Sequence, residues 1–393
     1  MPLPEVHLAG GTSAEAARLA PVATAMRGQG RLKPVLVATG PDPQAFTRTL
    51  AAFDQAPGYV VPAAPLGSVG PAGPLGPLGP LGPVGPVDAE MICQLDRLWA
   101  ANTPAAIMVQ GDGGGSLPAA LAAYWRRIPV VHLDAGRRSI EFGSATAAEA
   151  SRRLLAQVAT VHLAAAPLSA MNLLDERIAG GDVLLTGNTS VDAAQAMAGR
   201  RLPYADPALA RWRAAGADRL LVVAVEHTGN VALELVRTAV RRLVASYPDL
   251  DVVMLGADSP GGSCRIAGAG HPAYPDRSRL LAEAYLILTD DGDLHEEALA
   301  FGVPALVLRE LTDRTESMFN GCARLVGAGT EAIVTAVSEL LDSRVRRDAM
   351  AAAGNPYGDG LAGRRAAQAT AALLGHGPFP DSMPDRHAAG ISR

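Results

Sequence analysis

The stretch Leu286–Glu316 constrains the fold of this chain more than any other segment. It begins with a short apolar run of strand length at 286–289, which the turn 290–293 (Asp-Asp-Gly-Asp) breaks. From 294 to 301 the apolar residues recur at the three-to-four spacing of a buried helix face, and a glycine and a proline then end the helix. A second apolar run follows at 305–308. Strand, turn, helix and strand in this order predict a βαβ unit of a parallel sheet.

The turn of this unit is a candidate ligand site. In open parallel sheets, ligands bind beyond the carboxyl ends of the strands, where helix N-termini point free N–H groups outward. The turn 290–293, Glu297 and Arg314 should therefore share one rim. A carboxylate there can accept hydrogen bonds from both hydroxyls of a ribose, and an arginine can hold a phosphate or a uracil edge. The alternative is a capping box of Asp293 with Glu296 plus surface charge. We favour the capping box for Glu296 and the site for Glu297 and Arg314.

The composition is that of a globular protein with room for two domains. The chain has 393 residues, of which 49% are hydrophobic and 19% charged. A net charge of -5 predicts no nucleic-acid partner. Cys93, Cys264 and Cys322 are too scattered for a disulfide framework or a zinc site. Neither a signal peptide nor a membrane-spanning run is visible, so we expect a soluble cytoplasmic protein that does not bind membranes.

Apolar runs and helical patterns alternate along most of the chain. Six or seven such steps predict a doubly wound domain over 1–199, interrupted by a Gly/Pro-rich surface loop over 62–87. A connection rich in Pro, Asp and Arg over 200–218 leads to a second Rossmann-like domain over 219–365. Residues 366–393 are expected to form a helix that packs back on the first domain and a loose tail.

Two Rossmann-like domains facing a cleft form the α/β architecture called GT-B, and we expect the site in that cleft. In the second domain, the turn 226–230 precedes a long helix that ends at about Tyr247. The following segment, 256–276, is rich in Gly, Pro and Ser and shows little regular pattern. We therefore expect that segment to lack regular structure.

Several stretches, in the right order, resemble the UDP-N-acetylglucosamine 2-epimerase family. The resemblance extends from residue 10 to about residue 375, and the fold assignment rests on it more than on periodicity. The stretches that carry it are 10–22, 111–139, 149–153, 184–193, 288–316 and 355–360. It implies the interconversion of UDP-N-acetylglucosamine and UDP-N-acetylmannosamine, by elimination of UDP to 2-acetamidoglucal and its re-addition. It also implies that no cofactor is required and that the protein is a homodimer.

The resemblance implies two sets of site residues. Proton transfer at C2 requires carboxylates or a histidine, and the departing diphosphate requires cationic and backbone donors. The catalytic candidates are Arg18, Asp112, Asp134, Glu149, Glu226 and His227. The substrate-binding candidates are Gly11, Ser13, Arg138, Arg152, Asn188, Asp291, Gly292, Asp293, Glu297 and Arg314.

The chain departs from the family pattern at several of these positions. Ser13 stands where the family has an arginine, and Asp134 is one methylene shorter than the family's glutamate. The first, catalytic glutamate of the family aligns with Ala148. Asp291 and Asp293 replace a serine and a glycine, and two acids would repel a bound diphosphate unless they are protonated or turned away.

The nucleotide half of the site (Gly292, Glu297 and Arg314) is retained better than the sugar half. We predict an isomerase, a UDP-N-acetylglucosamine 2-epimerase, whose partner is a UDP-sugar. One alternative is a hydrolysing 2-epimerase or an epimerase for another UDP-sugar. The other is a catalytically silent UDP-sugar-binding protein, which Ala148 and the acidic turn favour.

Overall fold

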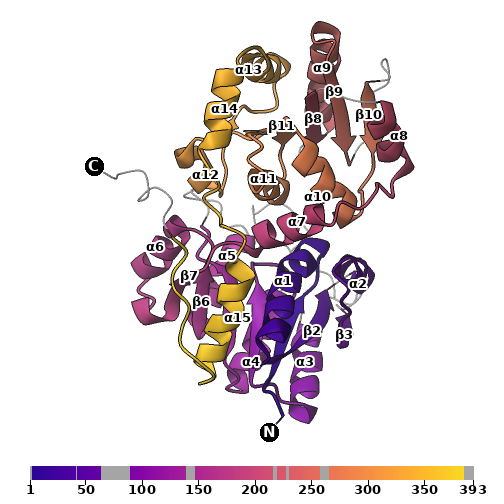
Figure 1. Cartoon of the computed structure of the whole chain (residues 1–393). Helices are drawn as coiled ribbons and strands as arrows, with labels where there is room; N and C mark the ends of the chain where they lie inside the picture. Colours follow the sequence, from indigo (N-terminus) through magenta and orange to yellow (C-terminus); the bar gives the residue numbers. More distant parts are fainter. Residues whose placement is uncertain are drawn as a thin grey trace, which may run out of the picture. The chain divides into compact units, whose positions relative to one another are not determined.

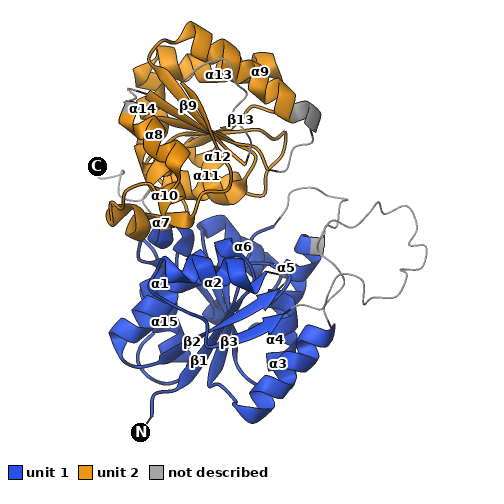
Figure 2. Cartoon of the chain, turned by 90° about the vertical axis from the view of Figure 1, so that its right-hand side faces the viewer, with its two compact units in different colours: residues 1–193, 358–393 blue, residues 194–357 orange. Residues whose placement is uncertain are grey.

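The chain divides into two compact units. Unit 1 comprises Met1–Ala193 and Gly358–Arg393, and unit 2 comprises Ala194–Tyr357 (Figure 2). The computed structural model describes residues 2–40, 42–62, 89–138, 147–215, 219–226, 230–256 and 265–384. The expected Gly/Pro-rich loop, apart from its first residue, and the end of the expected loose tail lie outside the described residues.

Unit 1 is built on a parallel sheet. The described residues form seven strands in the order β3-β2-β1-β4-β5-β6-β7. These strands are β1 (Glu5–Gly10), β2 (Lys33–Gly40), β3 (Tyr59–Pro62), β4 (Ala106–Gln110), β5 (Val130–Ala135), β6 (Val161–Ala164) and β7 (Val183–Leu185). Every neighbouring pair is parallel. The order reverses between β1 and β4, as in the predicted doubly wound fold.

Helices connect these strands (Figure 1). In the described part of unit 1 they are α1 (Ser13–Gln29), α2 (Pro43–Ala51), α3 (Ala89–Ala101), α4 (Ser116–Trp125), α5 (Ala147–Val158), α6 (Pro167–Asp175) and α15 (Ala362–Leu373), with the short 3-10 helix η1 (Gly180–Asp182). Helix α7 (Thr189–Gly199) begins in unit 1 and ends in unit 2. Trp99 of α3 is fully buried, and its indole N–H donates to His7 Nδ1 over 3.0 Å. Its polar atom is thus satisfied within the core.

The C-terminal helix α15 packs beside α1, although the two are far apart in sequence (Figure 1). A Cβ atom at Gly363 would lie 3.0 Å from the backbone carbonyl carbon of Pro21, so glycine permits this close approach. The first N–H groups of α15, those of Ala362 and Gly363, donate to the Asp192 carboxylate over 3.2 and 2.8 Å. Asp192 therefore satisfies donors that the helix itself leaves unpaired.

Unit 2 repeats the same topology. Its described residues form six parallel strands in the order β10-β9-β8-β11-β12-β13. The strands are β8 (Arg219–Ala224), β9 (Leu250–Leu255), β10 (Ile266–Ala269), β11 (Leu286–Thr289), β12 (Ala305–Val307) and β13 (Ala323–Leu325). The helices are α8 (Pro207–Ala215), α9 (Asn230–Ser246), α10 (Tyr274–Glu283), α11 (Gly292–Leu299), α12 (Thr315–Asn320), α13 (Thr330–Asp342) and α14 (Arg344–Ala352). The order reverses between β8 and β11, so each unit has one switch point.

The expectation that 256–276 lacks regular structure is wrong for its described part. Strand β10 lies at the edge of the sheet and pairs with β9, with Ile266 opposite Val252. Helix α10 has Pro275 in its first turn. A helix tolerates proline there, because the N–H groups of the first turn have no partner within the helix. Both elements depend on tertiary packing more than on a local pattern. None of the helices in the described ranges is long and apolar enough to cross a lipid bilayer.

Candidate active site

The switch point of unit 1 brings together residues from the ends of β1 and β4. Gly11 follows β1 and Asp112 follows β4, so both predicted residues lie at the edge where doubly wound sheets bind ligands. Glu15 Oε2 accepts hydrogen bonds from the N–H groups of Gly11 (2.6 Å) and Thr12 (2.9 Å). Thr12 accepts in return from the Glu15 N–H over 3.1 Å, which completes a capping box at the start of α1.

Glu15 packs closely against the turn that carries Asp112. Burial raises the pKa of Glu15, and the Asp112 carboxylate adds to this effect, while hydrogen bonds from Gly11 and Thr12 oppose it. A Cβ atom at Gly113 would lie only 1.9 Å from Glu15 Oε1. Glycine at 113 therefore lets the turn approach Glu15.

Helix α5 adds a second carboxylate and two arginines to this network. Arg152 Nε donates to Asp112 Oδ2 over 2.7 Å, and Arg152 also lies 3.5 Å from Glu149 Oε2. Arg153 Nε donates to Glu149 Oε1 over 2.9 Å. Residues three and four positions apart lie on one helix face, so α5 presents all three side chains together. The structure thus holds two predicted carboxylates, Asp112 and Glu149, in place through arginines.

Arg138 extends the same network. Its Nε and one terminal nitrogen donate to the two Glu176 oxygens over 2.8 and 2.6 Å, and its Nε lies 3.9 Å from Glu149 Oε1. The hydrogen bond from Arg138 lowers the pKa of Glu176. Sequence analysis missed Glu176, because it lies 38 positions from Arg138 and belongs to no motif. Glu176 orients Arg138 through a bidentate pair.

Asp134 lies at an irregular point of β5. The register between β5 and β6 shifts between Leu133 and Ala135, and Asp134 itself has a φ of 60°. Residues other than glycine seldom adopt this conformation, and such strain concentrates at functional sites. Asp134 Oδ2 accepts from Arg137 over 2.5 Å. This carboxylate is therefore also held by an arginine.

The switch point of unit 2 lies between β8 and β11. The N–H of Glu226, after β8, donates to Asp290 Oδ1 over 2.8 Å, which ties the ends of the two strands together. Asp291 is the N-cap of α11, and its side chain accepts from the Asp293 N–H over 2.9 Å. The predicted capping box of Asp293 with Glu296 is therefore wrong, because the helix starts earlier than the apolar pattern indicates.

Arg314 is held by three carboxylates. It donates to Asp293 (2.8 Å), Glu296 (2.9 Å) and Asp313 (2.8 Å). Burial alone would lower the pKa of Arg314, but Glu296, Asp313 and Asp293 raise it well above its ordinary value. The guanidinium lies against the first turn of α11, since a Cβ atom at Gly292 would be 2.2 Å from Arg314 Cζ.

Glu297 is buried beside α10. It is 3% exposed and accepts from the Arg277 guanidinium over 2.7 Å and from the Tyr274 hydroxyl over 3.2 Å. Burial alone would lower the pKa of Arg277, but Glu297 raises it above its ordinary value. Sequence analysis missed Arg277 and Tyr274, because α10 begins in the segment for which no regular structure was expected.

The remaining predicted residues lie as follows. Ser13 is exposed as the first residue of α1, and Arg18 is buried on the same helix. Asn188 Oδ1 accepts from the Ser190 N–H over 2.9 Å, which orders the start of α7. His227 lies outside the described residues.

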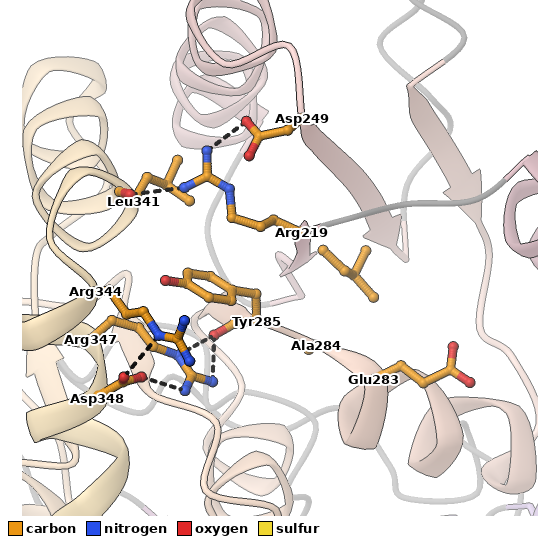
Figure 3. A pocket seen from close by; sticks show the side chains of 10 residues that line it. Arg219, Asp249, Glu283, Ala284, Tyr285, Leu341, Arg344, Arg347 and Asp348 are labelled. Carbon is orange, nitrogen blue, oxygen red and sulfur yellow. Dashed lines mark hydrogen bonds and ion pairs between the residues drawn. The ribbon is translucent and has the colours of Figure 1, made fainter.

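Unit 2 also contains a cavity of about 560 Å³ at the amino ends of its strands, the edge opposite to the start of α11 (Figure 3). Arg219 pairs with Asp249 over 2.6 Å, and Arg344 and Arg347 reach Asp348 over 3.3 and 3.2 Å. The carboxylates of the cavity wall thus offset its arginines. A nucleotide would gain little from this wall, and we place the candidate site at the carboxyl edge instead.

Two Rossmann-like units, each with charged side chains at its switch point, define the GT-B class of α/β proteins. They confirm the predicted fold class. The comparisons with known proteins agree with this class and narrow it.

A family model described as UDP-N-acetylglucosamine 2-epimerase matches residues 84–371. The UDP-N-acetylglucosamine 2-epimerase of Escherichia coli (strain K12) is 32% identical, over 68% of this chain and 75% of its own length. That of Bacillus subtilis (strain 168) is 30% identical, over 76% and 80%. The S. aureus MnaA–UDP co-structure is 26% identical with a TM-score of 0.83, and the match covers 97% of this chain and 100% of that one. The chain belongs to the UDP-N-acetylglucosamine 2-epimerase family, a family of isomerases, as the sequence predicted.

Proposed function

We propose that this chain interconverts UDP-N-acetylglucosamine and UDP-N-acetylmannosamine without hydrolysis. The observation that carries the proposal is the arginine-held pair of carboxylates, Asp112 and Glu149, near the switch point of unit 1. Removing a proton from C2 requires a base in a fixed position, and returning one to the opposite face requires an acid. Two carboxylates can divide these roles although Ala148 stands where the resemblance implies a catalytic glutamate.

In the proposed reaction, a carboxylate takes the C2 proton while the C1–O bond to UDP breaks with its electron pair leaving on UDP. The C1–C2 double bond of 2-acetamidoglucal forms. A UDP oxygen then attacks C1, and a proton is delivered to the other face of C2. Cationic and backbone donors are needed to offset the negative charge that develops on the departing diphosphate.

We assign recognition of the nucleotide to unit 2. Glu297 is the acceptor for the ribose hydroxyls, and Arg314 with the N-terminus of α11 is the site of the diphosphate. Arg277 supports this assignment, because it holds the Glu297 carboxylate in one orientation. The S. aureus relative, described as a co-structure with UDP, supports the nucleotide class.

A UDP-sugar-binding protein without turnover is the second candidate. It is favoured by Ala148 and by the three carboxylates that already surround Arg314. A hydrolysing epimerase differs from both in its products. One spectrum distinguishes the three.

We expect proton NMR of UDP-N-acetylglucosamine with the protein in deuterium oxide to show loss of the C2 proton signal and a new UDP-N-acetylmannosamine anomeric signal. Elimination breaks the C2–H bond, so the returning atom comes from solvent. Free UDP with free N-acetylmannosamine would instead indicate hydrolysis. An unchanged spectrum with line broadening would support the silent binding protein and contradict our proposal.

We also infer a homodimer that acts in the cytoplasm, as the resemblance implies. Sedimentation velocity at micromolar concentration is expected to give a single species near twice the mass of the chain, which is 40.4 kDa. A monomer across this concentration range would contradict the inference, because a stable dimer interface does not dissociate at such concentrations.

A further inference from the structure

We propose that Asp293 is a built-in counter-anion that weakens the hold of unit 2 on the diphosphate of its ligand. The inference rests on the proposed function, because it concerns the affinity of the same nucleotide site. It assigns to one side chain the control of how tightly UDP is bound.

The position of Asp293 carries the first part of the argument. It lies in the first turn of α11, and its Oδ1 accepts from an Arg314 terminal nitrogen over 2.8 Å. The guanidinium lies against Gly292 of the same turn. An anion that approached the N-terminus of α11 would therefore meet the Asp293 carboxylate, which already occupies the Arg314 guanidinium.

The charges around Arg314 carry the second part. One guanidinium pairs with three carboxylates, so Arg314 and its partners carry an excess of negative charge before any ligand binds. Glu296 is fully buried on α11 and remains with Arg314, and Asp313 precedes Arg314 directly in the chain. The Asp293 side chain is 25% exposed, more than those of Glu296 and Asp313, so it is the one with most room to turn away.

A diphosphate must therefore displace Asp293 or bind beside it. Displacement loses a charge-assisted hydrogen bond, and binding beside it leaves like charges close together. Either route lowers affinity for UDP relative to a site with a neutral residue at 293. Weaker binding of the UDP group also favours release of the UDP-linked product. It need not slow turnover, because tight binding of the ground state does not raise kcat.

The test compares UDP binding by the full chain in isothermal titration calorimetry. Asp293→Asn and Asp293→Ala are expected to bind UDP at least about fivefold more tightly than the wild type, from the loss of one nearby like charge in a medium of intermediate dielectric. Two substitutions are used so that the new amide of asparagine cannot explain the gain. Thermal melts check that each variant is folded.

Two matched variants serve as controls. Glu331→Gln removes a 79% exposed acid from α13 of the same unit, and its UDP affinity should equal that of the wild type. Asp313→Asn removes the carboxylate charge of another partner of Arg314, one that lies outside the first turn of α11. Its gain in UDP affinity should be smaller than that of Asp293→Asn.

Equal or weaker UDP binding in both Asp293 variants, with binding in the wild type, would overturn the inference and leave the proposed function standing. An equal gain in Asp313→Asn would overturn it too, because net charge alone would then explain the effect. If neither the wild type nor any variant bound UDP, the proposed nucleotide site would fail and the inference with it.

Discussion

Asp112→Asn is expected to lower kcat by about 10²–10⁴-fold while UDP affinity stays within about twofold of the wild type. The asparagine side chain has the same shape, and its oxygen can still accept from Arg152, which now donates to Asp112 over 2.7 Å. It cannot take a proton from C2 or return one. The loss should therefore fall on the chemical step.

This expectation is measured by turnover of UDP-N-acetylglucosamine, by incorporation of solvent deuterium at C2, and by calorimetry with UDP. Asp175→Asn, which removes an exposed acid from α6 of the same unit, is the matched control and should retain wild-type turnover. Full activity in Asp112→Asn would remove Asp112 from the acid–base set. Proton transfer would then have to be assigned to Glu149 or Asp134.

The two sheets are predictable from the sequence because parallel strands are buried on both faces and read as short apolar runs. Strands β4 and β11 are fully buried along their whole length, and polar turns begin directly after them. These turns place Asp112 and 290–293 at carboxyl edges of their sheets. The site positions at strand ends therefore follow from the fold pattern.

Elements that depend on neighbours are not predictable in this way. Strand β10, Ile266–Ala269, contains one glycine and two alanines, and it becomes a strand by pairing with β9 at a sheet edge. Helix α10 follows it. Missing these two elements also meant missing Arg277, the partner of Glu297.

Ion pairs are the least predictable part of the candidate site. The chain has 34 Lys and Arg and 39 Asp and Glu, so each basic residue has many possible acidic partners. The sequence alone therefore does not predict that Arg138 pairs with Glu176 or that Arg314 pairs with Asp293. Electrostatics does predict that two acids at 291 and 293 must be protonated or turned away from an anion. The structure uses Asp291 as the N-cap of α11, whereas the Asp293 carboxylate stays on Arg314, the guanidinium assigned to the diphosphate.

Glu297→Ala is expected to lower UDP affinity at least about tenfold, because a good charge-assisted hydrogen-bond acceptor contributes on the order of 1.5–3 kcal/mol. It should also destabilise unit 2 by about 3–5 kcal/mol, the usual cost of leaving one partner of a buried ion pair. Glu297 is 3% exposed, and its loss leaves the buried Arg277 without this carboxylate. Urea denaturation measures the second effect, and calorimetry with UDP measures the first.

The two effects separate in a double-mutant cycle. Arg277→Met in the Glu297→Ala background removes the uncompensated charge, so stability should recover in part while UDP affinity stays low. Glu297→Gln should be the milder change, since its oxygen can still accept from Arg277 or from a ribose hydroxyl. If folded Glu297→Ala bound UDP with wild-type affinity, Glu297 would be only a structural partner of Arg277. The ribose acceptor would then have to be sought elsewhere on the carboxyl edge of unit 2, where Glu226 follows β8 and its N–H donates to Asp290.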